Sequence, residues 1–269
     1  MSRRIPDCFE TAANTGRKVL IPFLTTGDPD PDWTVAIMHA LADAGADLIE
    51  LGVPFSDPTA DGPVIQAASE RAIAKQVDLA SVLTTVETFR RTDDATPVVL
   101  MGYLNPVERF GKNRFPSAAA GAGVDGLLLV DCPPEERGEL DGSMYAAGLD
   151  GICLVAPTTT RDRVRSIAAV ATGFIYYVSL KGITGTGQID ARELGQPVTQ
   201  IREYSDLPVA VGFGIEDAEA AVKVARHADA VVIGSALVQA LSDAETEHAA
   251  CSVAAAFVAP VREALDNMV

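Results

Sequence analysis

Short runs of apolar residues alternate with longer amphipathic stretches along almost the whole chain. The runs are rich in valine, leucine and isoleucine and hold few charges, which is typical of parallel strands buried on both faces. We expect strands over residues 18–24, 48–51, 98–101, 126–130, 151–155, 174–178, 209–212 and 230–234.

The stretches between these runs repeat apolar residues at helical spacing. Asp32 is the expected N-cap of the first internal helix, because its carboxylate can accept free N–H groups of a first helical turn. We expect helices over residues 5–15, 34–44, from 64 onward, 79–91, 134–147, 161–171, 191–204, 217–226, from 236 onward, and 251–268.

One short pattern recurs where a helix gives way to a strand. It is found as Ala44-Gly45-Ala46-Asp47, Ala122-Gly123-Val124-Asp125 and Ala147-Gly148-Leu149-Asp150, with a weaker copy at His227-Ala228-Asp229. Glycine just past a helix end takes the left-handed conformation that other residues resist. The pattern therefore marks repeated helix-to-strand units.

Eight strand candidates, nearly all followed by a helix, favour a closed barrel over an open doubly wound sheet. The length of 269 residues suits one barrel, and no linker or low-complexity segment divides the chain. We predict an α/β fold, a (β/α)8 TIM barrel with extra N-terminal and C-terminal helices, as a single domain over residues 1–269. In such a barrel the loops after the strands form the active site.

Composition narrows the possible functions. The formal net charge of −16 argues against nucleic-acid binding, which needs a basic face, and an anionic ligand would need local donors such as backbone N–H groups. No apolar stretch approaches the ~18 residues of a membrane helix, and the N-terminus lacks the apolar segment of a secretory signal. The cysteines and histidines show no ligand spacing, so we expect reduced thiols, no metal site and a cytoplasmic location.

Two acidic residues near the second strand are the strongest candidates for catalysis. Glu50 ends a buried apolar run, where an unpaired carboxylate loses its water and its pKa rises. The structural alternative for Glu50 is a salt bridge to an arginine or lysine on the same face. Asp61 lies in the irregular loop that follows, and its alternative is to cap the helix that begins after Pro63.

Glycines after the last three strands form a second candidate site. Gly185, Gly214, Gly234 and Ser235 would present backbone N–H groups beside a helix that begins near Ala236. Loops after strands seven and eight of a barrel, with a short helix N-terminus, commonly bind phosphate. The alternative is that each glycine only permits a tight turn.

Three further residues could each have either a functional or a purely structural role. Tyr103 and Tyr176 are either walls of a pocket or ordinary core aromatics. Lys181 lies in a glycine-rich loop after the sixth strand, which is typical of a mobile lid, or it is a solvated surface charge.

Longer motifs carry a resemblance to a known family. The run ELGVPFSDP from Glu50 to Pro58, followed by ADGPVIQ from Ala60 to Gln66, resembles the signature of the tryptophan synthase alpha subunit family. This long motif is specific, whereas the short glycine pairs are not. Shorter motifs along nearly the whole chain fit the same family: Pro22-Phe23, Thr26-Gly27-Asp28-Pro29, Tyr103, Asn105-Pro106, Asp131, Pro133-Pro134-Glu135-Glu136, Gly182-Ile183-Thr184-Gly185, Gly212-Phe213-Gly214-Ile215 and Gly234-Ser235-Ala236-Leu237-Val238.

The resemblance implies a reaction and a role for each acid. The family cleaves indole-3-glycerol phosphate to indole and glyceraldehyde 3-phosphate, a retro-aldol lyase reaction. By similarity, Glu50 is the general acid and base that protonates indole carbon 3 and helps remove the glycerol hydroxyl proton. Asp61 accepts a hydrogen bond from the indole N–H and stays ionised to stabilise the positive charge on the ring.

The resemblance also assigns the binding residues. Thr184 matches the lid residue that closes onto the loop acid. The expected contacts of the indole or its surroundings are Phe23, Met101, Tyr103 and Tyr176. The expected phosphate binders are Gly185, Gly214, Gly234 and Ser235. No metal or organic cofactor is implied, because pyridoxal phosphate belongs to the beta subunit of this family.

The resemblance implies a beta-subunit partner in an alpha2-beta2 heterotetramer. The alternative is a free-standing lyase that releases indole. An isomerase or an indole-glycerol-phosphate-forming synthase would share the glycines, but such a synthase should carry a lysine on an early strand, where this chain has Glu50. A barrel kept only to activate a partner would tolerate loss of the acids. Cys132 replaces the family's commoner leucine near the partner interface, and the lid continues as Thr186-Gly187-Gln188.

Overall fold

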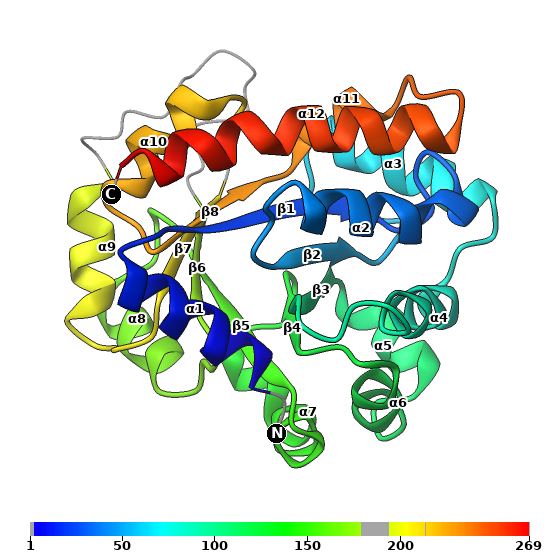
Figure 1. Ribbon diagram of the computed structural model, residues 1–269. Coiled ribbons are helices and arrows are strands. Elements are labelled where there is room, and N and C mark those ends of the chain that lie inside the picture. Colours follow the sequence, from blue (N-terminus) through cyan, green and yellow to red (C-terminus); the bar gives the residue numbers. More distant parts are fainter. Residues whose placement is uncertain (1–2, 179–193, 213, 269) are drawn as a thin grey trace.

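Parallel strands form a closed barrel in the order β1 to β8, as predicted (Figure 1). The computed structural model describes residues 3–178, 194–212 and 214–268. Each strand lies within one residue of its predicted bounds at either end. The strands are β1 Val19–Thr25, β2 Ile49–Gly52, β3 Val98–Gly102, β4 Gly126–Leu129, β5 Asp150–Val155, β6 Ile175–Val178, β7 Val209–Gly212 and β8 Ala230–Ile233.

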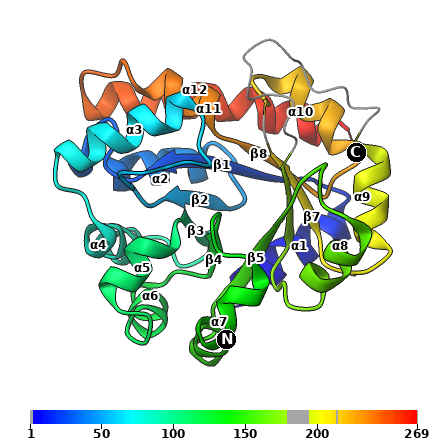
Figure 2. The same cartoon turned by 180° about the vertical axis from the view of Figure 1, so that it is seen from behind.

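Helices surround this barrel on the outside. They are α1 Arg4–Thr15, α2 Thr34–Asp43, α3 Pro63–Ala74, α4 Leu79–Phe89, α5 Leu104–Phe110, α6 Phe115–Ala122, α7 Pro134–Ala147, α8 Arg161–Ala168, α9 Gly195–Arg202, α10 Ala218–Ala225, α11 Ser235–Leu241 and α12 Glu247–Asp266. The long α12 packs against α2, α10 and α11 (Figure 1). Seen from behind, α4, α5 and α6 lie together on one side and α8 and α9 on the other (Figure 2). No helix in the described part of the chain is long and apolar enough to cross a membrane.

Two helices were not predicted, namely α5 and α6. Their sequences contain Pro106 and Pro116, which are helix breakers in a helix interior. Both prolines lie in the first turn of their helix, where the missing N–H has no intrahelical partner to lose. Position within the helix, and not the presence of proline, decides the outcome here.

The predicted capping role of Asp32 is wrong. The neighbouring Asp30 takes an extended backbone conformation, and its carboxylate accepts a hydrogen bond from the Asp32 N–H at 3.1 Å. This caps a 3-10 turn, η1 Pro31–Trp33, which leads directly into α2. Because the turn supplies the entry to α2, that helix begins at Thr34 without a side-chain cap.

The barrel interior is apolar where the strands begin. Alternate residues of each strand point inward, and they form one buried cluster with Ile5 and Phe9 of α1. The Phe9 ring lies 5.6 Å from the Phe174 ring, measured between centroids. The extra N-terminal helix therefore contributes to the same core as the strand interiors.

The repeated aspartates have a structural role that explains the recurring sequence pattern. Asp47, Asp125 and Asp229 each precede an even-numbered strand, and each carboxylate accepts a backbone N–H from the strand before it. These bonds come from Leu20, Val98 and Val209 at 2.8, 2.8 and 2.9 Å. The same three carboxylates also accept guanidinium N–H groups from Arg262, Arg90 and Arg202 respectively. We call each such arrangement an aspartate clip.

Glycines two residues before the aspartate make room for two of these clips. Gly45 and Gly123 both have positive φ, at +103° and +90°. A Cβ at Gly45 would lie 2.6 Å from Cγ of Arg262, and one at Gly123 would lie 2.6 Å from Cγ of Arg90. The glycine is thus required both for the left-handed backbone and for space beside the arginine.

We predict opposite effects of alanine at two glycines near the C-terminal end of α6, Gly121 within the helix and Gly123 just past it. Gly123→Ala should lower the free energy of unfolding by about 2 kcal/mol or more, because it combines left-handed strain with the contact to Arg90. Gly121→Ala, in the last turn of the helix with nothing within 4 Å of the new Cβ, should raise it by up to about 1 kcal/mol. Urea unfolding curves of both variants measure this, and a neutral Gly123→Ala would refute the requirement for glycine.

Candidate functional site

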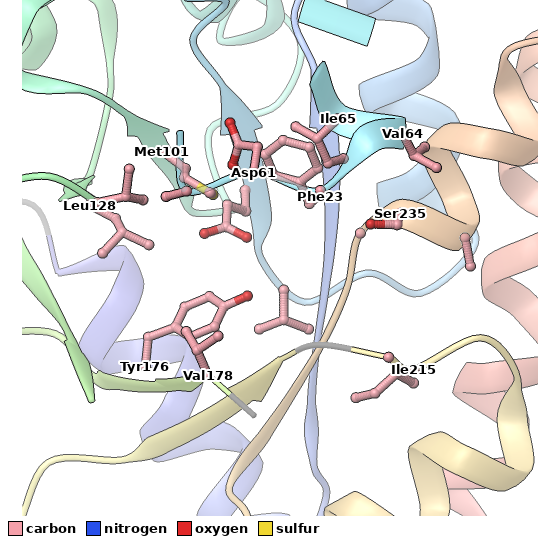
Figure 3. Close-up of a pocket in the computed structure, with 18 of the residues that line it drawn as sticks. Phe23, Asp61, Val64, Ile65, Met101, Leu128, Tyr176, Val178, Ile215 and Ser235 are labelled. Atoms are coloured by element: carbon pink, nitrogen blue, oxygen red, sulfur yellow. The ribbon is translucent and has the colours of Figure 1, made fainter. Parts of the chain in front are cut away.

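A cavity of about 710 Å³ opens at the carboxyl ends of the barrel strands. Figure 3 shows Asp61, Met101, Tyr176 and Ser235 around this cavity, each from a different element. The lining residues are Phe23, Glu50, Thr59, Ala60, Asp61, Gly62, Val64, Ile65, Met101, Leu128, Val130, Leu154, Ala156, Tyr176, Val178, Gly214, Ile215, Glu216, Val232, Gly234, Ser235, Ala236 and Gln239. The walls are thus largely apolar, and their polar groups include the acids Glu50, Asp61 and Glu216 together with three glycines and Ser235.

Glu50 is a buried acid without a counterion in the described part of the chain. Its side chain comes from the middle of β2, and the residue is 2% exposed. Its Oε1 has no hydrogen-bond partner among the described residues, so the salt-bridge alternative is wrong for this part of the structure. Burial, and then the charge of Asp61, raise the pKa of Glu50 to about 8.

Asp61 faces the same cavity from the loop between β2 and α3. Burial raises its pKa to about 6, and a hydrogen bond from the Tyr103 hydroxyl opposes this rise. That hydroxyl donates to Oδ2 of Asp61 at 3.1 Å. Gly62, not Asp61, is the N-cap of α3, and no side chain caps that helix. The capping alternative is therefore wrong, and the carboxylate is left to face the cavity.

Strand register places apolar residues of the two neighbouring strands beside Glu50. Phe23 of β1 pairs with Glu50, and Val99 of β3 pairs with it from the other side. Two residues after Glu50 on the same face, a Cβ at Gly52 would lie 2.6 Å from the Phe23 ring. Because Gly52 has no side chain, the Phe23 ring can lie beside β2 and line the cavity next to the acid.

Tyr176 forms part of the cavity floor. Its ring comes from β6 and is 8% exposed, and its hydroxyl fills the space beside Gly212 that a side chain would otherwise occupy. Burial, and then the charge of Glu50, raise the pKa of this tyrosine well above its usual value. The tyrosine therefore remains neutral while it faces the acid.

Backbone groups gather at one corner of the cavity, where Gly234 lies beside Phe23. Gly214, Gly234 and Ser235 all line it, and Ser235 is the first residue of α11. The first N–H groups of a helix have no intrahelical acceptor and carry partial positive charge. This corner is therefore suited to an anion. Thr184, Gly185 and Lys181 lie outside the described residues.

The structure gathers most of the predicted site residues into one cavity. Phe23, Glu50, Asp61, Met101, Tyr176, Gly214, Gly234 and Ser235 all line it. Tyr103 instead lines a smaller cavity of about 10 Å³ behind Asp61. Sequence reasoning missed the apolar residues Leu128, Leu154 and Val178, although their inward position follows from the alternation of residues along each strand. Among the described residues no cluster of histidine, cysteine, aspartate or glutamate suits a metal ion.

Comparisons with known proteins agree with the site. The model of the tryptophan synthase alpha chain family matches residues 9–266. The chain belongs to the tryptophan synthase alpha chain family. It is 57% identical over 264 residues to the tryptophan synthase alpha chain of Burkholderia pseudomallei (strain 1106a), covering 98% of this chain and 97% of the relative. It is 54% identical over 265 residues to that of Leptothrix cholodnii, with the same coverage.

Solved structures of the family share the fold over the full length. Tryptophan synthase subunit alpha from Legionella pneumophila str. Paris has a TM-score of 0.91 and 42% identity, covering 99% of this chain and 100% of the other. Tryptophan synthase from M. tuberculosis, in an aminoacrylate-bound form, has a TM-score of 0.87 and 33% identity, covering 98% and 100%. The family's activity is a lyase step in tryptophan synthesis, which confirms the resemblance seen in the sequence.

We predict that Glu50→Gln removes a pH dependence of stability. The native state binds the Glu50 proton more tightly than the unfolded chain, so stability should fall as pH rises from about 4.5 to about 8. Above pH 8 the buried charge should destabilise the wild-type chain by on the order of 5 kcal/mol, and the glutamine variant should not show this loss.

Urea unfolding at pH 5.5 and pH 9 measures this effect. The difference in stability between the two pH values should be smaller in Glu50→Gln than in the wild-type chain. The matched control is Glu87→Gln, which removes an exposed acid of α4 and should follow the wild type. Parallel behaviour of all three proteins would show that Glu50 is not buried as a proton-binding group.

Proposed function

We propose that this chain catalyses retro-aldol cleavage of indole-3-glycerol phosphate to indole and glyceraldehyde 3-phosphate. The observation that carries the proposal is the pair of acids on one cavity, Glu50 with its pKa raised to about 8 and Asp61 with its pKa raised to about 6. Near neutral pH this pair holds one proton on Glu50 and one charge on Asp61. That is the arrangement required of a proton donor next to a stabiliser of positive charge.

The proposed proton transfers balance around Glu50. Its carboxyl group gives a proton to carbon 3 of the indole, and the ring becomes positively charged. The bond from carbon 3 to the hydroxyl-bearing carbon of the glycerol chain then breaks, and its electron pair neutralises the ring. The Glu50 carboxylate takes the proton of that hydroxyl as it becomes the aldehyde, so the acid is restored. Asp61 accepts the indole N–H and stabilises the cationic ring.

The proposed substrate orientation follows from the cavity walls. The indole would lie among apolar side chains such as Phe23, Met101 and Tyr176. The phosphate would lie against Gly214, Gly234 and Ser235, where backbone N–H groups of α11 begin. Local donors are required because the chain as a whole carries a formal charge of −16 and repels an anion. Thr184 and Gly185 are proposed to complete the lid and the phosphate site.

We infer that the chain works with a beta subunit as an alpha2-beta2 heterotetramer, in the cytoplasm, with residues 1–269 as one domain. Family membership and the likeness to a solved tryptophan synthase support the partner. The free thiols of Cys8, Cys132, Cys153 and Cys251 are in keeping with a reducing compartment. No cofactor is proposed for the lyase step, because Glu50 and Asp61 supply its proton donor and its charge.

We predict that loss of either acid severely reduces indole production. Glu50→Gln should lower turnover of indole-3-glycerol phosphate by roughly a thousandfold or more, because no group remains to give and take the proton. Asp61→Asn should also lower it severely, because the ring cation loses its counterion. Indole release, followed by its absorbance, measures both.

Binding and a control separate chemistry from folding in this experiment. Glyceraldehyde 3-phosphate should still bind both variants, measured by calorimetry, because the phosphate corner is untouched. Glu87→Gln, an exposed acid of α4, should keep wild-type turnover. Near wild-type turnover in Glu50→Gln or Asp61→Asn would refute the role given to that residue.

The alternative is a free-standing lyase that releases indole to solvent. Both proteins would use the same cavity, so the test is the response to a partner. We expect turnover of indole-3-glycerol phosphate to rise at least about tenfold when a tryptophan synthase beta subunit is added in excess, which corresponds to about 1.4 kcal/mol of activation free energy. Equal turnover with and without the beta subunit, and no complex by gel filtration, would favour the free-standing lyase.

A further inference from the structure

Tyr103 lies behind Asp61, on the side away from the large cavity. It follows β3 directly, is 3% exposed and is the N-cap residue of α5. Its ring packs against Phe55 with 5.0 Å between centroids. The next backbone N–H, of Leu104, donates to Oδ1 of Asp131 at 2.8 Å. Packing on one side and a fixed backbone on the other leave this tyrosine little freedom.

The Tyr103 hydroxyl joins two neighbouring residues of the Asp61 loop. It accepts the backbone N–H of Ala60 at 3.0 Å and donates to Oδ2 of Asp61 at 3.1 Å. A phenol has one proton to give. Because the Ala60 N–H occupies a lone pair of the oxygen, the phenol proton is directed to the carboxylate.

The two cavities show which side of Asp61 each group occupies. Asp61 lines both the large cavity and the small one, so it forms part of the wall between them. Tyr103 lines the small cavity and is not among the described residues that line the large one. The small cavity has a volume of about 10 Å³, which is too small to hold an indole ring beside Tyr103.

We propose that Tyr103 is a positioning residue, which holds the Asp61 carboxylate in the orientation that receives the indole N–H and keeps that carboxylate ionised. The proposal rests on the proposed function of Asp61, and it replaces the direct contact with indole that the sequence suggested for Tyr103. The tyrosine acts without touching the substrate. It fixes one carboxylate oxygen and leaves the other to face the large cavity.

The charged neighbours determine the direction of the expected shift. Glu50 faces Asp61 from β2, and Asp131 acts on Tyr103 from the loop after β4. Both are acids, so the hydroxyl is the group that favours the ionised form of Asp61. Burial and the charge of Asp61 raise the pKa of Tyr103, so it keeps its proton and remains a donor. Removing the hydroxyl should therefore raise the pKa of Asp61.

Tyr103→Phe tests the proposal by two separate readouts. First, carbon-13 NMR of aspartate-labelled chain should show the Asp61 carboxyl titrating at a higher pH in the variant, with the signal assigned by its loss in Asp61→Asn. Second, kcat for indole-3-glycerol phosphate should fall about tenfold, as expected for one lost hydrogen bond to a charged group, while KM changes less than about threefold. The acid limb of the kcat profile should move to higher pH with the NMR midpoint.

The outcomes are distinguishable from failure of the proposed function. If the wild-type chain does not cleave the substrate, the proposed function fails, yet the NMR shift still tests the link between Tyr103 and Asp61. An unchanged Asp61 midpoint, or a raised KM with unchanged kcat, overturns the positioning role. The control is Tyr145→Phe, which removes an exposed hydroxyl of α7 and should leave both readouts unchanged.

A second variant keeps the test valid if Tyr103→Phe does not fold. Replacing Tyr103 with 3-fluorotyrosine retains the ring and makes the phenol a stronger donor. It should move the Asp61 midpoint and the acid limb to lower pH, opposite to phenylalanine. A shift to higher pH, or none, would refute the proposal.

Discussion

An unpaired carboxyl group buried at the mouth of the barrel is the constraint that the rest of the structure accommodates. Burying Glu50 without a described counterion destabilises the ionised state, and this cost must be offset elsewhere. The offset comes from the apolar layers nearer the strand beginnings, which α1 joins through Ile5 and Phe9. A barrel that is fully packed where its strands begin can therefore hold an acid with a raised pKa near the strand ends and still keep its fold.

Carboxyl groups have different roles at the two ends of the barrel. Where the strands begin, Asp47, Asp125 and Asp229 each meet an arginine and a backbone N–H, so their charges hold neighbouring strands together. Where the strands end, Glu50 and Asp61 face the cavity and lack such cations among the described residues, and burial raises the pKa of both, as it also does for Asp47. Pairing thus separates acids that stabilise the scaffold from acids that remain available for proton chemistry.

Much of this could be predicted from the sequence, and the failures have physical reasons. The buried strands and the position of Glu50 were predictable, because short apolar runs that alternate with amphipathic stretches are typical of buried parallel strands. Asp32 was predicted to cap α2, but that helix has no side-chain cap, because the 3-10 turn capped by Asp30 leads directly into it. Tyr103 was expected near the indole or its surroundings, and the sequence did not reveal its hydrogen bond to Asp61, which joins residues 42 apart in the chain. Side-chain direction at loops depends on such long-range contacts, which local patterns do not encode.

The clip at Asp47 also sets an order of events during synthesis. Its arginine, Arg262, comes from α12, so this hydrogen bond joins residues 215 positions apart. The same guanidinium donates to the carbonyl oxygen of Lys18 at 2.9 Å, at the start of β1. The first two strands therefore leave the ribosome long before the residue that secures them has been translated. In the nascent chain, the Asp47 carboxylate and the Lys18 carbonyl oxygen therefore lack this guanidinium until α12 has been translated.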